Sequence, residues 1–240
     1  MITWPNGARA AVSLSFDDAR LSQPDVGFAL LEKLGVHATF YVSIGSMNQR
    51  LDAWKRAAGA GHEIGNHSMT HPCSGNYEFA RKNALEDYSL ERMSRDIEQA
   101  DIEIHRLLGS KTTTFAYPCG QKFIGRGEKT QSYVPLVAKR FKIGRGYNDT
   151  MMNDPEFFDP AQVMGVNSDS KTFDELGRDF EIALKRSGWL VLAGHEMAEA
   201  NAFQTTTFST IAAIVRFCKE NNIWLDTVDR VGTHVLAARK

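Results

Sequence analysis

Ala10-Ala-Val-Ser-Leu-Ser-Phe-Asp-Asp18 is a largely apolar run of strand length that ends in two carboxylates. Such a run is typical of a strand that is buried on both faces of a parallel sheet. Similar runs recur along the chain, rich in Val, Ile, Phe and Tyr and mostly bounded by Gly, Pro, Asn or Asp. The predicted strands are 10–16, 37–42, 63–66, 114–117, 142–144, 162–166, 189–193 and 223–228.

Stretches with helical spacing of apolar residues lie between these strands. The predicted helices are 24–34, 52–60, 88–108, 131–139, 173–186 and 206–220. The first three run into Gly35, Gly61 and Gly109, and glycine is the preferred residue just after a helix C-terminus. Strands that alternate with helices indicate an α/β fold with a parallel sheet, either open or closed as a barrel. No linker-like tract or internal repeat divides the sequence, so we expect residues 1–240 to form a single domain.

The composition excludes several classes of protein. Lys and Arg total 28 and Asp and Glu total 29, which gives a net charge of −1. Because there is no basic surplus to neutralise a phosphate backbone, nucleic acid is not an expected partner. The longest apolar stretches have only the length of strands, so we expect no transmembrane helix and no membrane partner. A small molecule or a neutral polymer fits this charge balance better.

The cysteines are Cys73, Cys119 and Cys218, an odd and sparse set that does not indicate a disulfide framework. Cys73 and Cys119 could lie near a metal, but we expect both to be small buried side chains. The N-terminus lacks the basic start and apolar run of a signal peptide. These features favour a cytoplasmic protein, although a trimmed form of an exported protein would give the same pattern.

Polar residues that can carry chemistry follow several of the predicted strands. Asp17 and Asp18 follow the first strand, His67 to His71 the third, residues 117–120 the next, and His195 a late one. The carboxyl ends of parallel strands meet on one face of an α/β fold, and that face carries the active site in barrels and open sheets. Residues that are far apart in the sequence are therefore expected to meet there.

His67 and His71 are candidate metal ligands. Their separation of four places both imidazoles on one side of either a helix or a strand. Two histidines and one carboxylate, with a position left for water, form a common catalytic zinc site. Iron and other divalent metals accept the same ligands. On its own, such a pair is more commonly an ordinary surface or core feature.

Asp17, Asp18 and His195 complete the candidate constellation. Neighbouring residues of an extended chain point to opposite sides, so one carboxylate can bind a metal while the other acts as a base. Alternatively, the pair caps a helix N-terminus. An imidazole at the end of the apolar run before His195 can protonate a leaving group. Its alternative is a hydrogen-bonded histidine at a strand end.

These motifs, in this order, resemble the polysaccharide deacetylases, the fourth carbohydrate esterase family. The resemblance covers most of the chain, from Ala10 to about Val228. It is carried by Ser15-Phe-Asp-Asp18, by His67-Ser-Met-Thr-His71 with its lead-in Gly61-His-Glu-Ile-Gly65, and by Leu190-Val-Leu-Ala-Gly-His195. The resemblance implies a distorted parallel (β/α) barrel of about seven strands.

The resemblance also implies a role for each residue. Asp17 is the general base, and His195 is the general acid. Asp18, His67 and His71 hold one divalent metal, for which zinc is the first expectation and cobalt, iron, manganese and nickel are the others. The substrate and oxyanion positions fall on Tyr117 and on Cys119, whose backbone N–H is the expected oxyanion donor. Asp169 is expected to orient His195, with Asn167 as the second choice.

One departure from the family pattern concerns the partner of Asp17. The third motif of the family has an Arg that pairs with the catalytic base, and Ala116 occupies that place here. Arg20, Arg126 and Arg145 are candidates for the missing partner, and a plain surface position is the alternative for each.

Three functions fit these observations. The first is a metal-dependent hydrolase that removes acetyl groups from an acetylated saccharide. The second is a metal-dependent amidohydrolase that acts on a small C–N bond outside sugars, and the third is a carbohydrate-binding protein that has lost catalysis. Substrate choice is expected to lie in the loops 120–131 and 146–160, where aromatic side chains could stack on sugar rings: Tyr133, Tyr147, Phe157 and Phe158.

Overall fold

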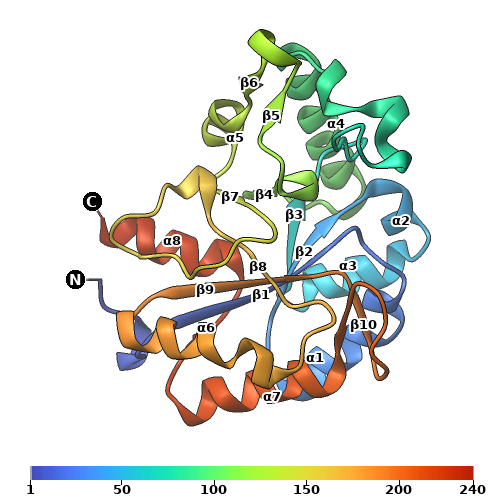
Figure 1. The fold of residues 1–240 in the computed structure, drawn as a ribbon. Coiled ribbons are helices and arrows are strands. Elements are labelled where there is room, and N and C mark those ends of the chain that lie inside the picture. The colour runs from blue at the N-terminus through green and yellow to red at the C-terminus, as the bar shows by residue number, and fades with distance from the viewer. Residues whose placement is uncertain (1, 240) are drawn as a thin grey trace.

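The computed structural model describes residues 2–239. A parallel sheet lies at its centre (Figure 1). Its strands are β1 (Ala11–Asp17), β2 (Thr39–Val42), β3 (Glu63–Asn66), β4 (Thr114–Ala116), β7 (Ile143–Arg145), β8 (Val166–Asn167), β9 (Trp189–Gly194) and β12 (Trp224–Leu225). The strand order is β7-β4-β3-β2-β1-β9-β8, and β12 pairs with the beginning of β1.

The two edges of this sheet are linked by single parallel bridges. Arg145 at the end of β7 pairs with Val163, and Asp149 pairs with Val166 in β8. Gly146 N donates to Val163 O at 2.7 Å, and Val163 N donates to Gly144 O at 2.8 Å. The sheet is therefore curled into a distorted parallel barrel, and the predicted fold class is confirmed.

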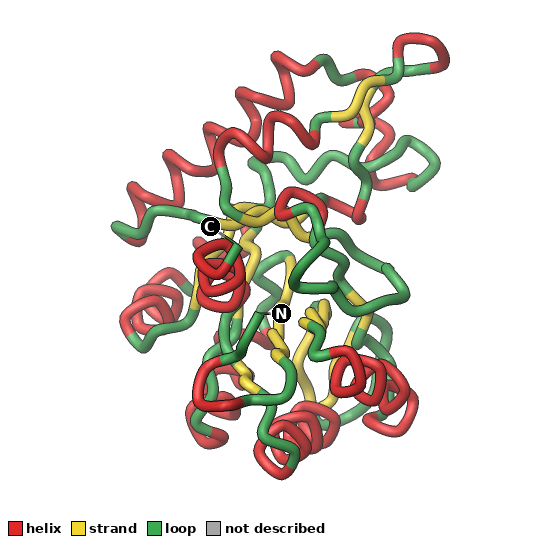
Figure 2. The backbone as a smooth tube through the Cα atoms, turned by 90° about the vertical axis from the view of Figure 1, so that its left-hand side faces the viewer, coloured by secondary structure: helices red, strands yellow, loops and turns green. Residues whose placement is uncertain are grey.

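Helices cover the outside of the strands (Figure 2). They are α1 (Phe28–Leu34), α2 (Ile44–Asn48), α3 (Leu51–Gly59), α4 (Leu90–Leu108), α5 (Val134–Arg140), α6 (Phe173–Arg186), α7 (Phe208–Glu220) and α8 (Val228–Ala238). In Figure 1, α6 and α7 lie below the sheet and α4 and α5 above it. As predicted, Gly35 and Gly109 follow α1 and α4 in the left-handed conformation, with φ of 68° and 69°. Across residues 2–239, no helix has the length and apolar character needed to cross a membrane.

Alternation along β1 separates the apolar layer from the barrel interior. Val12, Leu14 and Phe16 belong to the large apolar cluster that packs against the helices. Ser13 and Asp17 have the opposite parity and therefore face the interior. Trp189 in the neighbouring strand β9 donates from Nε1 to Ser13 Oγ at 3.0 Å, a contact between adjacent strands on that interior face. The pleat of one strand thus directs Asp17 into the barrel at its carboxyl end.

Several predicted elements differ from the structure. The predicted strand 162–166 is wrong for most of its length, because only Val166 lies in β8. Two further differences have clear local causes. Residues 131–139 are not one helix, because Gln131–Ser132 form strand β6, antiparallel to β5 (Phe123–Ile124), and α5 begins only at Val134. The predicted strand 223–228 is shortened to β12, because Thr227 caps a helix that sequence analysis missed. Its side chain accepts from Arg230 N, and α8 packs Val231 and Val235 against the barrel core.

Candidate active site

Predicted site residues from five strand ends, those of β1, β3, β4, β8 and β9, line one cavity of about 880 Å³. The predicted residues found in its wall are Asp17, Asp18, His67, His71, Cys119, Asp169 and His195. All of them end or follow strands of the parallel sheet, so the carboxyl face of the barrel brings them together.

Asp18, His67 and His71 form a compact group of metal donors. Asp18 Oδ1 lies 3.6 Å from His67 Nε2 and 3.3 Å from His71 Nε2, and all three donor atoms lie within 4.8 Å of one another. His67 Nδ1 lies 2.9 Å from Ala116 O, which fixes the proton on Nδ1 and leaves the Nε2 lone pair free for a ligand bond. Asp18 Oδ2 pairs with Arg20 at 2.9 Å. The donor set and its orientation fit a divalent metal.

The backbone that presents these ligands is neither helix nor extended strand. Asp18, Ser68 and His71 have left-handed φ values of 70°, 63° and 48°. The helix or strand geometry predicted for the histidine pair and the extended geometry predicted at Asp18 are therefore wrong, although these residues do lie together. The loop is shaped instead by its own side chains: Ser68 Oγ accepts from His71 N at 3.0 Å, and Asn66 Oδ1 accepts from Ser68 N at 2.7 Å.

Burial sets the charge state of the ligands. It lowers the pKa of His67 to about 4, so the ring is neutral at physiological pH, as a metal ligand must be. Burial alone would raise the pKa of Asp18, but the surrounding histidines and Arg20 outweigh it, and the net pKa lies below the ordinary value.

Arg145 is the buried partner of Asp17. Its Nη2 forms an ion pair with Asp17 Oδ1, its Nη1 donates to Gly146 O at 2.8 Å, and its side chain is fully buried. The guanidinium also lies over the Tyr41 ring, 4.7 Å from the centroid. An arginine at the end of β7 thus pairs with Asp17, whereas the family pattern has this arginine at the position of Ala116, the last residue of β4. A Cβ on Gly165 would lie 2.6 Å from Arg145 Cδ, so the glycine beside it makes room for this side chain.

The other two candidate arginines have different partners. Arg20 pairs with Asp18, as described above. Arg126 pairs with Asp87 at 2.9 Å, and both side chains are exposed. Arg126 and Arg145 are both flanked by glycines, but only Arg145 directly follows a predicted strand, 142–144, and this was the available signal in the sequence.

His195 and Asp169 form a second buried pair. Asp169 Oδ2 lies 2.6 Å from His195 Nδ1, and Asp169 Oδ1 accepts from His195 N at 3.0 Å. Burial by itself lowers the pKa of His195, but the hydrogen bond to Asp169 and the charges of Asp17 and Asp169 outweigh it, so the pKa is raised. Asn167, the second choice, contacts Asp169 instead: its Oδ1 accepts from Asp169 N at 2.8 Å.

The turn Pro118–Gly120 places Cys119, but not Tyr117, in the cavity wall. Cys119 has φ of 53°, and Gly120 N donates to Tyr117 O at 2.8 Å. Tyr117 is fully buried and donates its hydroxyl to Ala161 O at 2.7 Å. The prediction that Tyr117 meets the substrate is therefore wrong, because its ring packs in the apolar cluster with Phe115.

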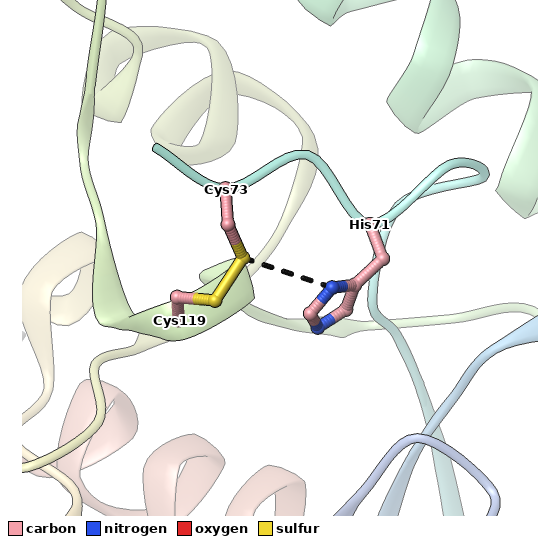
Figure 3. A group of neighbouring side chains, drawn as sticks. All are labelled: His71, Cys73 and Cys119. Carbon is pink, nitrogen blue, oxygen red and sulfur yellow. Dashed lines mark hydrogen bonds between the residues drawn. A yellow bond between two sulfur atoms is a disulfide. The ribbon is translucent and has the colours of Figure 1, made fainter. Parts of the chain in front are cut away.

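Cys73 and Cys119 form a disulfide across a sequence separation of 46 (Figure 3). The expectation of two separate buried cysteines is therefore wrong. Their spacing carries no disulfide signal, and only the fold brings the two loops together. The expectation of a cytoplasmic protein rested in part on the absence of such a bridge and loses that support. Cys218 is a free, buried cysteine in α7.

Aromatic side chains at the cavity come mostly from loops that sequence analysis did not select. Tyr77, Phe79 and Phe203 line the cavity and are 48%, 69% and 86% exposed. Of the four aromatic residues predicted to stack on sugars, only Tyr147 lines it. The other three lie elsewhere: Tyr133 is fully buried, Phe158 packs against Trp189, and Phe157 is exposed outside the cavity.

Comparison with known sequences gives one family. The family model described as polysaccharide deacetylase matches residues 5–132. A gellan lyase of Bacillus sp. is 28% identical over 143 residues, which are 59% of this chain and 5% of that protein. The uncharacterized protein YlxY of Bacillus subtilis (strain 168) is 30% identical over 91 residues, 38% of this chain and 25% of that protein. The chain thus spans at most a quarter of the length of these curated relatives.

Solved structures share the fold. A Mycobacterium smegmatis protein that is provisionally called a polysaccharide deacetylase has a TM-score of 0.68 and 13% identity, covering 98% of this chain and 93% of that one. The peptidoglycan deacetylase PdaC of Bacillus subtilis has a TM-score of 0.55 and 18% identity, and the match covers 96% of this chain and 93% of that one. A pseudoenzyme of the CE4 family from Bacillus anthracis has a TM-score of 0.59 and 17% identity, and the match covers 95% of this chain and 66% of that one. At these identities the likeness concerns the fold alone.

Proposed function

The chain belongs to the polysaccharide deacetylase family, and from that premise we propose that it is a metal-dependent hydrolase that removes acetyl groups from a saccharide. One observation carries the proposal: a buried carboxylate–arginine pair, a metal-donor group and a buried histidine–carboxylate pair face the same cavity. Each is an arrangement that hydrolysis of an acetyl group requires.

Asp18, His67 and His71 would hold the metal, with zinc as the first expectation. A bound divalent ion supplies Lewis acidity, which polarises the acetyl carbonyl and lowers the pKa of water. The contribution of the chain is to keep His67 neutral through burial and to orient its ring through Ala116 O. Arg20 engages Asp18 Oδ2 and leaves Oδ1 toward the histidines.

Asp17 would act as the general base, taking a proton from the water that attacks the acetyl carbon. Arg145 holds the Asp17 carboxylate through a fully buried ion pair, which fixes its direction and stabilises its charge. The N–H of Cys119 would donate to the oxyanion of the tetrahedral intermediate. No protein nucleophile is needed, and the Cys119 sulfur is held in a disulfide.

His195 would act as the general acid. Its Nδ1 is engaged by Asp169, so Nε2 is the nitrogen left to protonate the departing sugar amine or hydroxyl. Because the pKa of His195 is raised, more of the imidazole carries this proton at neutral pH than in an ordinary histidine. Asp169 is thus a positioning residue, because it acts through His195.

The Arg145–Asp17 pair also bears on the alternative of a carbohydrate-binding protein without catalysis. That alternative was favoured by the missing motif arginine, and Arg145 supplies the missing partner from another strand. A binding protein has no need for a buried, charge-paired base. We therefore favour the hydrolase.

Acetate release from N-acetylglucosamine oligomers and acetylated xylan, with and without chelator, tests this function. We expect acetate release that chelation abolishes. Ammonia or other products from small amides would favour an amidohydrolase instead, and saccharide binding without turnover would favour a binding protein.

Two substitutions separate the roles of the neighbouring carboxylates. Asp17→Asn should keep metal binding and lose activity, because the base is removed while the ligands remain. Asp18→Ala should lose metal binding as well. Metal content and acetate release are measured together, with Asp87→Asn at the exposed surface as the matched control. A fully active Asp17→Asn variant would remove the base assignment.

A further inference from the structure

The Cys73–Cys119 disulfide lies directly beside one of the three candidate metal ligands (Figure 3). Cys73 Sγ is 3.7 Å from His71 Nδ1. The other ring nitrogen, His71 Nε2, faces Asp18 Oδ1 at 3.3 Å. The His71 ring therefore stands between two donor groups, with Asp18 on one side and the sulfur atoms on the other.

The sulfur side is a second group of three donors. One donor atom each from His71, Cys73 and Cys119 lies within 4.8 Å of the others. In the disulfide the sulfur atoms carry no negative charge and are poor ligands. As thiolates they are soft, strong ligands for divalent metals. Two thiolates and one imidazole make up three of the four donors of a common type of zinc site.

We propose that reduction of the Cys73–Cys119 disulfide creates a second metal site, formed by Cys73, Cys119 and His71, for a soft divalent cation such as Zn²⁺, Co²⁺ or Cd²⁺. The sulfur site uses His71 Nδ1 and the first site uses His71 Nε2. A neutral imidazole has only one unprotonated nitrogen, so occupation of the sulfur site withdraws a ligand from the group with Asp18. The disulfide is then a redox switch: the oxidised chain supports the first site and the reduced chain the second. Only the consequence for catalysis rests on the proposed function.

The reductant is a dithiol, which supplies both electrons. One of its thiolates attacks the Cys119 sulfur, the bond between the two protein sulfurs breaks, and Cys73 leaves as a thiolate that takes up a proton. The second thiol of the reductant then attacks the mixed disulfide, which releases Cys119 as a thiol and closes the reductant into a cyclic disulfide. Cys119 is only half-buried and lines the cavity, whereas Cys73 is fully buried, so the attack at Cys119 is the accessible one.

Co²⁺ absorption spectroscopy tests the proposal without reference to turnover. The oxidised protein and the protein reduced by a dithiol, with the reductant removed under argon, are titrated with Co²⁺. We expect strong sulfur-to-cobalt charge-transfer absorption in the near ultraviolet only for the reduced protein, and its loss on reoxidation. Thiol counting on the unfolded chain verifies that Cys73 and Cys119 are reduced. A reduced protein without this absorption overturns the proposal.

Three variants locate the signal. Cys218→Ala should retain the absorption, because Cys218 is buried in α7 and is not part of the donor group. Cys73→Ser should lose most of it, since one sulfur is removed. Asp18→Ala should keep it, because the sulfur site does not use Asp18. Absorption that persists in Cys73→Ser but disappears in Cys218→Ala overturns the assignment.

Acetate release by the wild-type protein gives the consequence for catalysis. With a single equivalent of Zn²⁺, we expect the reduced protein to lose activity and the reoxidised protein to regain it. An oxidised protein that never releases acetate, but whose reduced form gives the sulfur absorption, refutes the proposed function and leaves the second site standing. Unchanged activity in a reduced protein that shows the sulfur absorption refutes the competition for His71.

Discussion

At the scale of the residue, the pair of Arg145 and Asp17 is the contact most important for the stability and the chemistry of the site. Both side chains are buried in the barrel, and the two residues are 128 positions apart in the sequence. A buried ion pair is costly to break, because removing one partner leaves the other charge buried without compensation. The arginine is therefore expected to affect both the stability and the chemistry of the site.

Replacement of Arg145 by methionine measures this contribution. Arg145→Met should lower the free energy of unfolding by about 3–5 kcal/mol, since Asp17 remains buried and unpaired. Activity should fall with it. Urea unfolding and acetate release are the measurements. Arg126→Met, which breaks the exposed pair with Asp87, should cost about 1 kcal/mol or less. Equal losses in the two variants would contradict the structural account.

The pair of Asp169 and His195 makes a prediction about pH. His195 must be protonated to act as an acid, so activity falls as the pH rises through its pKa, which lies above the ordinary value of 6.5. Asp169→Asn removes the hydrogen bond to a charged carboxylate, which is the largest cause that raises this pKa. The alkaline limb of the kcat/KM profile should therefore move to lower pH. An alkaline limb that stays in place would show that Asp169 does not act through His195.

At the scale of the element, the barrel depends on close approach between β7 and the segment before β8. A Cβ added to Gly165 would collide with Gly146 O and would lie 2.6 Å from Arg145 Cδ. The same contact that joins the two edges of the sheet therefore also positions the buried arginine. Gly177, in the middle of α6, has no atom within 4 Å of an added Cβ.

Two glycine substitutions use this contrast. Gly165→Ala should destabilise the fold by about 1–3 kcal/mol, because the added methyl group overpacks the contact. It should also reduce activity by displacing Arg145. Gly177→Ala should stabilise the protein by about 0.5–1 kcal/mol, because alanine is the better helix former. Urea unfolding measures both. Stabilisation by Gly165→Ala would mean that the two sheet edges are not in close contact.

Most long elements could be predicted from the sequence because their signals are local. The buried strand before Asp17 is a continuous apolar run, and glycines end α1 and α4. α8 was missed because the predicted strand 223–228 extends across Asp226 and Thr227 to Val228, the first residue of the helix, and the capping role of Thr227 depends on only one side chain. Short elements such as α2 carry too few residues for a periodic signal.

The candidate site was predictable to the extent that its residues follow predicted strands. Asp18 and His67 could be placed near each other from topology alone. The partner of Asp17 and the disulfide could not, because each contact joins residues far apart in the sequence, 128 and 46 positions, and no local pattern signals either contact. Tyr117 was misplaced because a one-residue change of parity along a strand moves a side chain from the cavity to the core.

At the scale of the whole molecule, the carboxyl face of the barrel gathers the candidate metal donors and the proposed base and acid, Asp17 and His195, in one cavity. The proposed hydrolysis uses these groups together, and it depends on the metal-donor group. The chain contributes a neutral His67, a charged Asp18 and the shared ligand His71. Activity should therefore follow metal occupancy.

Stepwise addition of Zn²⁺ to metal-free, disulfide-bonded protein tests this dependence most directly. Acetate release from N-acetylglucosamine oligomers or acetylated xylan is measured at each step. The account predicts no activity at the start, a linear rise, and a plateau at a single ion per chain, with Asp18→Ala inactive throughout. Metal-free protein that is as active as the reconstituted protein would contradict it.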